Sequence, residues 1–223
     1  DFLENVSNEV SVFDNWAGEK EFYGSKKKAW QSDWAKLPPS TKQLLLFLNQ
    51  PLMLNVIEFF MNERNLISDP YLEGGGIHST GQNGFLKIHA DFNWHEKLQL
   101  YRRINILIYL NKDWKSNYGG QIELARKNSK GILDNKISID PTFNRTLIFI
   151  TDDNSYHGQP KPVNHPKSLR RNSIAAYYYT SKKPKGSSYL KRTGTDYLDD
   201  SGKRIGDHTV IRLIKQKILS YLK

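Results

Sequence analysis

Apolar residues recur at helical spacing between Ser40 and Asn65, where leucine, isoleucine, phenylalanine and methionine lie three or four positions apart. Pro39 precedes this segment and Pro51 interrupts it. Proline is tolerated in the first turn of a helix but breaks a helix interior. The pattern therefore predicts two packed helices that meet at Pro51.

The periodicity changes after the turn-rich segment DPYLEGGG, residues Asp69–Gly76, to short runs of β-branched and aromatic residues. Their connections are too short for the crossover helices of a parallel sheet, so a β-sandwich or barrel is predicted. The segment Ser181–Ser188 reads as a loop, and an amphipathic helix with an N-cap is expected from Asp207 to Lys223. The predicted strands are Phe85–Ala90, Ile104–Leu110, Gln121–Ala125, Arg145–Thr151 and Ser173–Thr180.

This order of elements predicts a single domain over residues 1–223, mainly β with flanking helices. Its core covers residues 70–180, residues 1–66 form a helical support, and residues 181–223 form a basic loop and the C-terminal helix. With 38% hydrophobic and 25% charged residues, the composition is that of a globular protein. No apolar run approaches the ~20 residues that span a bilayer, so no membrane association is expected.

Charge and cysteine content restrict the chemistry further. The net charge is +10, and residues 161–223 hold fifteen Lys or Arg against four Asp. Such a tail is compatible with a nucleic acid or another polyanion, but a solvated basic face is the more common explanation. The chain has no cysteine, which agrees with a cytoplasmic location without requiring it, and any metal site must use His, Asp or Glu. The chain opens at Asp1 without a methionine, which is compatible with a targeting segment that is missing from this sequence.

The stretch HADFNWH, residues 89–95, holds residue types that bind transition metals. If the strand ends here, His89 and Asp91 project from the same face, because side chains alternate along a strand. His95 lies beyond an expected turn and is the weaker candidate. His157, directly after the apolar run RTLIFIT, is the best third ligand. Two imidazoles and one carboxylate form a facial triad that leaves three positions of an octahedral iron open.

An arginine follows the third ligand in SLRRNSIAAYYYT. A co-substrate with a distant carboxylate needs a counter-charge, and the fork of a guanidinium suits a carboxylate better than an ammonium group does. Either Arg170 or Arg171 could serve. Alternation places Arg171, Ser173 and Tyr177 on one face, which fits a narrow anion pocket, so Arg171 is favoured.

Taken together, HAD, RRINILIYLNKDW, GGQIEL, RTLIFIT, YHG and RRNSIAAYYYT resemble the Fe(II)- and 2-oxoglutarate-dependent dioxygenases of the prolyl-4-hydroxylase-like branch. The stretch RINILIYLNKDW followed by GG is similar to the hypoxia-sensing prolyl hydroxylases, and DPYLEGGG with YYYT is similar to bacterial and viral 2-oxoglutarate oxygenases. The resemblance covers roughly residues 40–180. It implies a double-stranded β-helix, or jelly roll, in which N-terminal helices support one sheet.

The same resemblance implies roles for individual residues. His89, Asp91 and His157 would hold Fe(II), and Arg171, with Tyr109 beside it, would bind the C5 carboxylate of 2-oxoglutarate; Ser173 is included in this pocket. O2 is the second co-substrate, and ascorbate is a candidate reductant. This sequence departs from the hypoxia-sensing prolyl hydroxylases at two places. Ser79 stands where the hypoxia sensors have a tyrosine, with His78 as a candidate replacement, and the segment PKPVNHPKSL between His157 and Arg171 must loop out.

Substrate residues are the least determined part of the sequence. Trp94, Tyr101, Arg102 and Arg103 are expected near the entrance, Tyr177 is a further candidate, and His165 is expected at the surface. The leading hypothesis is a hydroxylase acting on a peptidyl proline or a small molecule. One alternative is a nucleic-acid demethylase of the same superfamily, although this sequence lacks the second arginine that such enzymes are expected to carry after RRNSIAAY. The other alternative is a non-catalytic metal-binding β-barrel. Neither the substrate nor the oligomeric state follows from the sequence.

Overall fold

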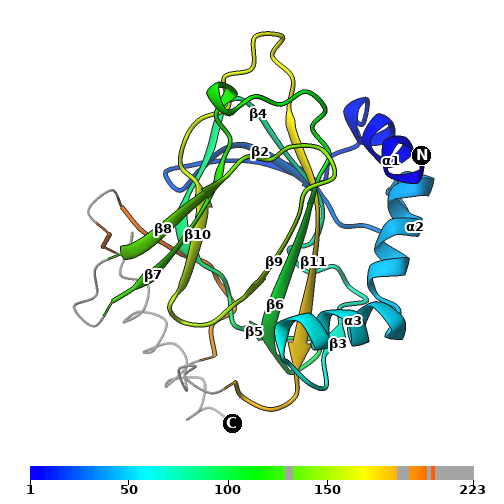
Figure 1. The fold of residues 1–223 in the computed structure, drawn as a ribbon, viewed down its shortest axis with the longest axis vertical. Coiled ribbons are helices and arrows are strands. Elements are labelled where there is room, and N and C mark those ends of the chain that lie inside the picture. The colour runs from blue at the N-terminus through cyan, green and yellow to red at the C-terminus, as the bar shows by residue number, and fades with distance from the viewer. Residues whose placement is uncertain (129–132, 185–190, 200–201, 204–223) are drawn as a thin grey trace, which may run out of the picture.

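The computed structural model describes residues 1–128, 133–184, 191–199 and 202–203. Strands form two walls that face one another, and three helices lie outside one of them (Figure 1). The wall beside the helices contains β6, β9 and β11, and the opposite wall contains β7, β8 and β10. This mainly antiparallel arrangement is a double-stranded β-helix, as predicted.

The helices are α1 (Phe2–Ser11), α2 (Pro39–Leu48) and α3 (Pro51–Met61). Both α2 and α3 begin with proline, whose fixed φ and missing N–H suit the first helical position. Helix α3 ends at Asn62, which adopts the left-handed conformation with φ of 51°. The two predicted helices and the break between them are therefore confirmed.

All five predicted strands are present, within a larger set that includes short edge strands and a hairpin near the N-terminus. The hairpin contradicts the expectation that residues 1–66 form a helical support. It was not predicted because its lysine-rich strands lack the apolar alternation that marks a strand. The strands are β1 (Gly18–Phe22), β2 (Ser25–Gln31), β3 (Ile67–Ser68), β4 (Gly76–Ala90), β5 (Trp94–His95), β6 (Leu100–Tyr109), β7 (Ile122–Lys127), β8 (Leu133–Ile139), β9 (Thr146–Ile150), β10 (Ser155–Gln159), β11 (Arg171–Thr180) and β12 (Asp196–Tyr197).

Strand β4 joins the two walls. Its first half pairs with β11, with Thr80 opposite Arg171, and its second half pairs with β10, with His89 opposite His157. Between these halves the pairing of β4 with β2 shifts register. At Gly84 in this shift, a Cβ atom would lie within 2.8 Å of atoms of Thr80, Gly81 and Lys26, so the bend requires glycine.

Side chains on β6 and β11 alternate between two environments. Ile106 and Ile174 point outward and pack with Leu45 and Ile57 of the helices. Leu107 and Tyr177 point inward, between the walls. The buried outward face explains why both strands are nearly continuous hydrophobic runs. The helices therefore stabilise the wall from which Arg171 projects.

Two predictions fall on residues outside the described ranges: the helix from Asp207, and residues 185–188 of the loop. Within the described ranges, no single helix is long and apolar enough to cross a membrane. Helices α2 and α3 together pass that test by length and composition but are bent by 57° at their break, and their buried leucines belong to the core.

Candidate active site

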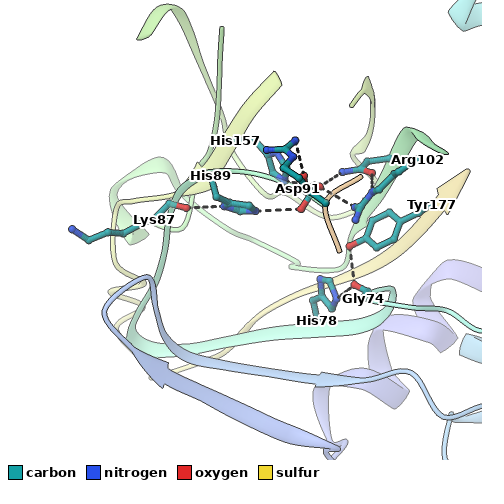
Figure 2. A network of polar contacts seen from close by, with 10 residues as sticks. Gly74, His78, Lys87, His89, Asp91, Arg102, His157 and Tyr177 are labelled. Atoms are coloured by element: carbon teal, nitrogen blue, oxygen red, sulfur yellow. Dashed lines mark hydrogen bonds and ion pairs between the residues drawn. The ribbon is translucent and has the colours of Figure 1, made fainter. Parts of the chain in front are cut away.

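Three candidate metal ligands converge at the mouth of the barrel (Figure 2). His89 lies near the end of β4, Asp91 follows that strand, and His157 lies opposite His89 on β10. One ligand atom from each lies within 4.8 Å of the other two. The two imidazole rings are 4.4 Å apart between centroids. The structure therefore brings together the three residues that the sequence singled out.

The orientation of the imidazoles fits a cation between them. Nδ1 of His89 lies 2.8 Å from the carbonyl oxygen of Lys87, which leaves Nε2 as the unprotonated nitrogen. That Nε2 lies 3.5 Å from Asp91 Oδ1, and Nε2 of His157 lies 3.4 Å from Asp91 Oδ2. Burial, the largest cause, lowers the pKa of His157 to about 3, so its ring is neutral at neutral pH. Lone pairs that face a carboxylate repel it unless a cation lies between them, so the donor set fits Fe(II).

The carboxylate of Asp91 is held from its other side by β6. Arg102 Nη2 and Asn105 Nδ2 lie 2.9 Å and 2.8 Å from Asp91 Oδ2. Burial acts to raise the pKa of the Asp91 carboxyl, but the Arg102 guanidinium beside it holds that pKa well below its usual range. Asp91 is therefore ionised and oriented toward the histidines.

Arg171 lies deeper between the walls and is buried. Its Nε donates to the carbonyl oxygen of Gly120 at 3.0 Å, and its Nη2 donates to the Tyr109 hydroxyl at 3.2 Å. Gly119 and Gly120 both have positive φ, a conformation that favours glycine and turns the chain beside Arg171. Arg170 instead points outward to Ser79 and Glu19. Of the two candidate arginines, only Arg171 lines the internal cavity.

Two cavities meet at His89 and Asp91. The inner cavity reaches from His157 to Arg171 and Ser173. The outer cavity has a volume of about 310 Å³ and opens on the other side of Asp91. A site in which the ligands separate an inner anion pocket from an outer chamber suits an enzyme that binds a co-substrate and a substrate side by side.

Of the predicted substrate residues, some line the outer cavity and others do not. Arg102 and Tyr177 line the outer cavity, and the Arg102 guanidinium lies 3.5 Å from the centroid of the Tyr177 ring. Trp94 does not line either cavity and packs on Tyr101, with ring centroids 4.8 Å apart, so its role as a substrate residue stays a prediction.

Three further predictions concern histidines. His95 lies apart from the metal cluster, with Nε2 3.3 Å from Asp69 Oδ1. His165 is buried against Trp114 and Tyr118 rather than at the surface, because the segment after His157 folds back as a loop onto these rings. His78 lines both cavities, which agrees with its suggested role at the co-substrate.

Several lining residues had no recognisable signal in the sequence. Lys20 and Lys28 come from the N-terminal hairpin, in a charged stretch typical of a solvated surface. Tyr197 lies on β12, which pairs with the end of β4, and its ring is 5.2 Å from that of His89. Asn105 lines the inner cavity, and only the structure shows its hydrogen bond to Asp91.

A double-stranded β-helix with two histidines and one aspartate at its mouth defines the class of mononuclear non-haem iron oxygenases. The family model described as 2OG-Fe(II) oxygenase superfamily matches residues 75–179, which include all three candidate ligands and Arg171. The matched region, residues 75–179, is a domain of the 2OG-Fe(II) oxygenase superfamily. As a member, it uses Fe(II) and 2-oxoglutarate.

Solved structures share this fold at low sequence identity. A prolyl-4-hydroxylase from Pseudomonas putida is 14% identical with a TM-score of 0.51, covering 81% of this chain and 87% of its own. HygX from Streptomyces hygroscopicus with nickel and 2-oxoglutarate bound is 12% identical with a TM-score of 0.52, covering 86% and 88%. The α-ketoglutarate-dependent epimerase SnoN from nogalamycin biosynthesis is 13% identical with a TM-score of 0.53, covering 92% and 86%. These similarities support the fold and do not indicate a substrate.

Proposed function

We propose that this oxygenase hydroxylates an unactivated C–H bond of a substrate bound in the outer cavity, in the manner of prolyl hydroxylases. The observation that carries the proposal is the cluster of His89, Asp91 and His157 at the boundary between the two cavities. An intact carboxylate ligand favours hydroxylation, because related halogenases leave that ligand position open for a halide. The motif RINILIYLNKDW adds support for a prolyl-hydroxylase-like reaction.

Each group has a defined task in this proposal. His89, Asp91 and His157 would hold Fe(II), and Arg171 would bind the distal carboxylate of 2-oxoglutarate in the inner cavity, with Ser173 on the same wall and Tyr109 fixing the guanidinium. When bound, Fe(II) and 2-oxoglutarate supply the redox chemistry that converts O2 and 2-oxoglutarate into succinate, CO2 and a hydroxyl group on the substrate. The protein excludes water and positions the C–H bond.

The proposal is tested by anaerobic titration of the metal-free protein with Fe(II) and then 2-oxoglutarate, followed through the visible charge-transfer absorption of an iron-bound keto acid. We expect the band in the wild type and its loss or displacement in Asp91→Ala. Arg171→Ala should raise the 2-oxoglutarate Kd by about 10-fold or more, because removal of a charge-assisted hydrogen-bonding partner costs about 1.5–3 kcal/mol.

Arg170→Ala is the matched control, since the neighbouring guanidinium faces Ser79 and Glu19 instead of the cavity. It should leave the 2-oxoglutarate Kd within about twofold of the wild-type value. Absence of the band at saturating Fe(II) and 2-oxoglutarate would overturn the proposed function, and equal effects of the two arginine variants would overturn the assignment of Arg171.

A further inference from the structure

Three cationic side chains line the two cavities from a row of paired positions on four neighbouring strands: Lys20, Lys28 and Arg171. Lys20 on β1 pairs in register with Lys28 on β2, Lys28 pairs with Thr80 on β4, and Thr80 pairs with Arg171 on β11. Adjacent strands lie about 4.8 Å apart, so the Lys20 backbone is roughly 14 Å from that of Arg171. The row therefore offers positive charge at two separate places, one at each end.

The two lysines are an unfavourable pair as they stand. Like charges directly opposite one another on an antiparallel hairpin destabilise it. Lys28 is half-buried, and burial, followed by the charges of Lys20 and Arg171, lowers its pKa to about 7. Two cations side by side at a partly desolvated wall would be stabilised by an anion bound between them.

The other charges of the outer cavity do not neutralise this pair. Arg102 is matched by Asp91 at 2.9 Å, and that carboxylate is also a candidate metal ligand. Glu73, the remaining acid in the lining, is 40% exposed and lies 3.5 Å from His95 Nε2. Arg171 lies at the inner end of the row and serves the co-substrate in the proposed function. The surplus positive charge of the outer cavity is therefore at Lys20 and Lys28.

Aromatic rings form much of the remaining wall. Trp30, Phe92, Tyr177 and Tyr197 line the outer cavity, and Lys20 Nζ lies 5.7 Å from the centroid of the Trp30 ring. The faces of such rings accommodate a flat apolar group. The volume of about 310 Å³ is at the lower end of the range for small-molecule pockets.

We propose that the substrate of the outer cavity is a small molecule with a flat apolar body and an anionic group, carboxylate or phosphate, held by Lys20 and Lys28. This inference rests on the proposed function, since it takes the outer cavity as the substrate site. Lys28 lines both cavities, whereas Lys20 lines only the outer one. The anion of the substrate is therefore distinct from the 2-oxoglutarate carboxylate at Arg171.

The test uses three probes that share one aromatic ring: phenyl phosphate, benzoate and neutral benzamide. Each is titrated anaerobically into the protein loaded with Fe(II) and 2-oxoglutarate, and binding is followed by tryptophan fluorescence, with Trp30→Phe used to assign the signal. We expect at least one anion to bind 10-fold or more tightly than benzamide. The order of phenyl phosphate and benzoate then identifies the anionic group.

Lysine variants locate the anion. Lys20→Gln and Lys28→Gln should each weaken binding of the preferred anion by about 10-fold and leave benzamide binding unchanged. Lys26→Gln is the control, because Lys26 is exposed on the same strand and lines neither cavity. Lys20→Gln should leave the 2-oxoglutarate Kd unchanged.

Two results would overturn the inference: anions that bind no better than benzamide, or a Lys28→Gln variant that weakens 2-oxoglutarate binding while anion binding stays at the wild-type value. The charge-transfer band separates this failure from failure of the proposed function. If the band forms and the anions show no preference, only the substrate class is wrong. If the band never forms, the proposed function is wrong and the inference falls with it.

Discussion

Asn105 shows how one inward-facing residue supports the candidate ligands without being a ligand itself. Its amide donates to Asp91 Oδ2 at 2.8 Å and also accepts from Arg102 Nε at 2.9 Å. It therefore links the carboxylate to the guanidinium that neutralises it. Residues that orient a metal ligand in this way contribute about 10–100-fold to metal affinity.

Replacing Asn105 by Ala should raise the Kd for Zn(II) or Mn(II) by about 10-fold, because Asp91 loses a donor that fixes its rotamer. Isothermal titration calorimetry on the folded variant measures this change. Asn8→Ala, at an exposed position of α1, is the control and should leave the metal Kd unchanged. A metal Kd for Asn105→Ala equal to that of the wild type would show that Arg102 alone orients the carboxylate.

The charge of Lys28 affects the stability of the fold. In a buffer without binding anions, Lys28→Met should stabilise the protein by up to about 1 kcal/mol at pH 6, because it removes a like-charge cross-strand pair. For a chain of this size that free energy corresponds to about 2–4 °C in Tm. The charges that act on Lys28 are those of Lys20, Arg171 and Arg102, which repel it, and Asp91, which attracts it.

The sign of the pH dependence follows from the lowered pKa of Lys28. Between about pH 7 and 10.5 the unfolded chain holds a proton that the folded chain has lost, so the stability of the wild type rises with pH relative to Lys28→Met. The difference in Tm should be largest below pH 7 and disappear as the pH approaches 10.5. Thermal melts at several pH values check this, and a gap that widens with rising pH would contradict it.

At the scale of single elements, β4 determines the geometry of the site. It is 15 residues long, pairs with β11 at one end and with β10 at the other, and carries His89 just before Asp91. The bend at residues 81–84 lets one strand contribute to both walls. The distance between the ligands and Arg171 is therefore set by the shape of this strand.

Gly84→Ala tests that conclusion. The added Cβ would lie 2.7 Å and 2.8 Å from the carbonyl oxygens of Gly81 and Lys26, which cannot move without shifting the strand. We expect destabilisation by about 1–3 kcal/mol in urea denaturation. Gly81→Ala is the matched control, because the nearest atom is the side-chain Nη1 of Arg170 at 3.0 Å, which can rotate away, so its effect should be smaller. Equal effects would show that the bend does not depend on Gly84.

In the molecule as a whole, a bound metal would link strands that are far apart in sequence. His89 and His157 come from β4 and β10, and Tyr197 from β12 covers His89. A metal held by these strands binds the native state and not the unfolded chain. At a hundred times its Kd, such a metal should add about 2.7 kcal/mol to the free energy of unfolding.

A melt with and without Mn(II) should therefore show a higher Tm in the metal-loaded wild type, and a chelator should reverse it. Asp91→Ala should lose most of this shift, because it lacks the anionic ligand. An Asp91→Ala protein that is stabilised by Mn(II) as strongly as the wild type would place the metal elsewhere in the molecule.

The secondary-structure class and the core of the candidate site were predictable from the sequence, and the resemblance of its motifs to a known family implied the jelly-roll fold. Helical and strand periodicities differ sharply in residues 40–65 and 104–110, and the alternation rule places His89 with Asp91, and Arg171 with Ser173, on common faces. These features are local, because a side chain's direction along one element depends only on its position in that element.

Features that depend on pairing between distant segments were not predictable from the sequence and are visible only in the folded protein. The hairpin that brings Lys20 and Lys28 into the cavity, the packing of Tyr197 on His89 and the burial of His165 all come from segments far from the ligands in sequence. Their residue types match ordinary surface or loop composition, so no local pattern marked them. The position of Trp94, which lines neither cavity, was not predictable for the same reason, since closeness along the chain does not specify which way a strand pairs after a turn.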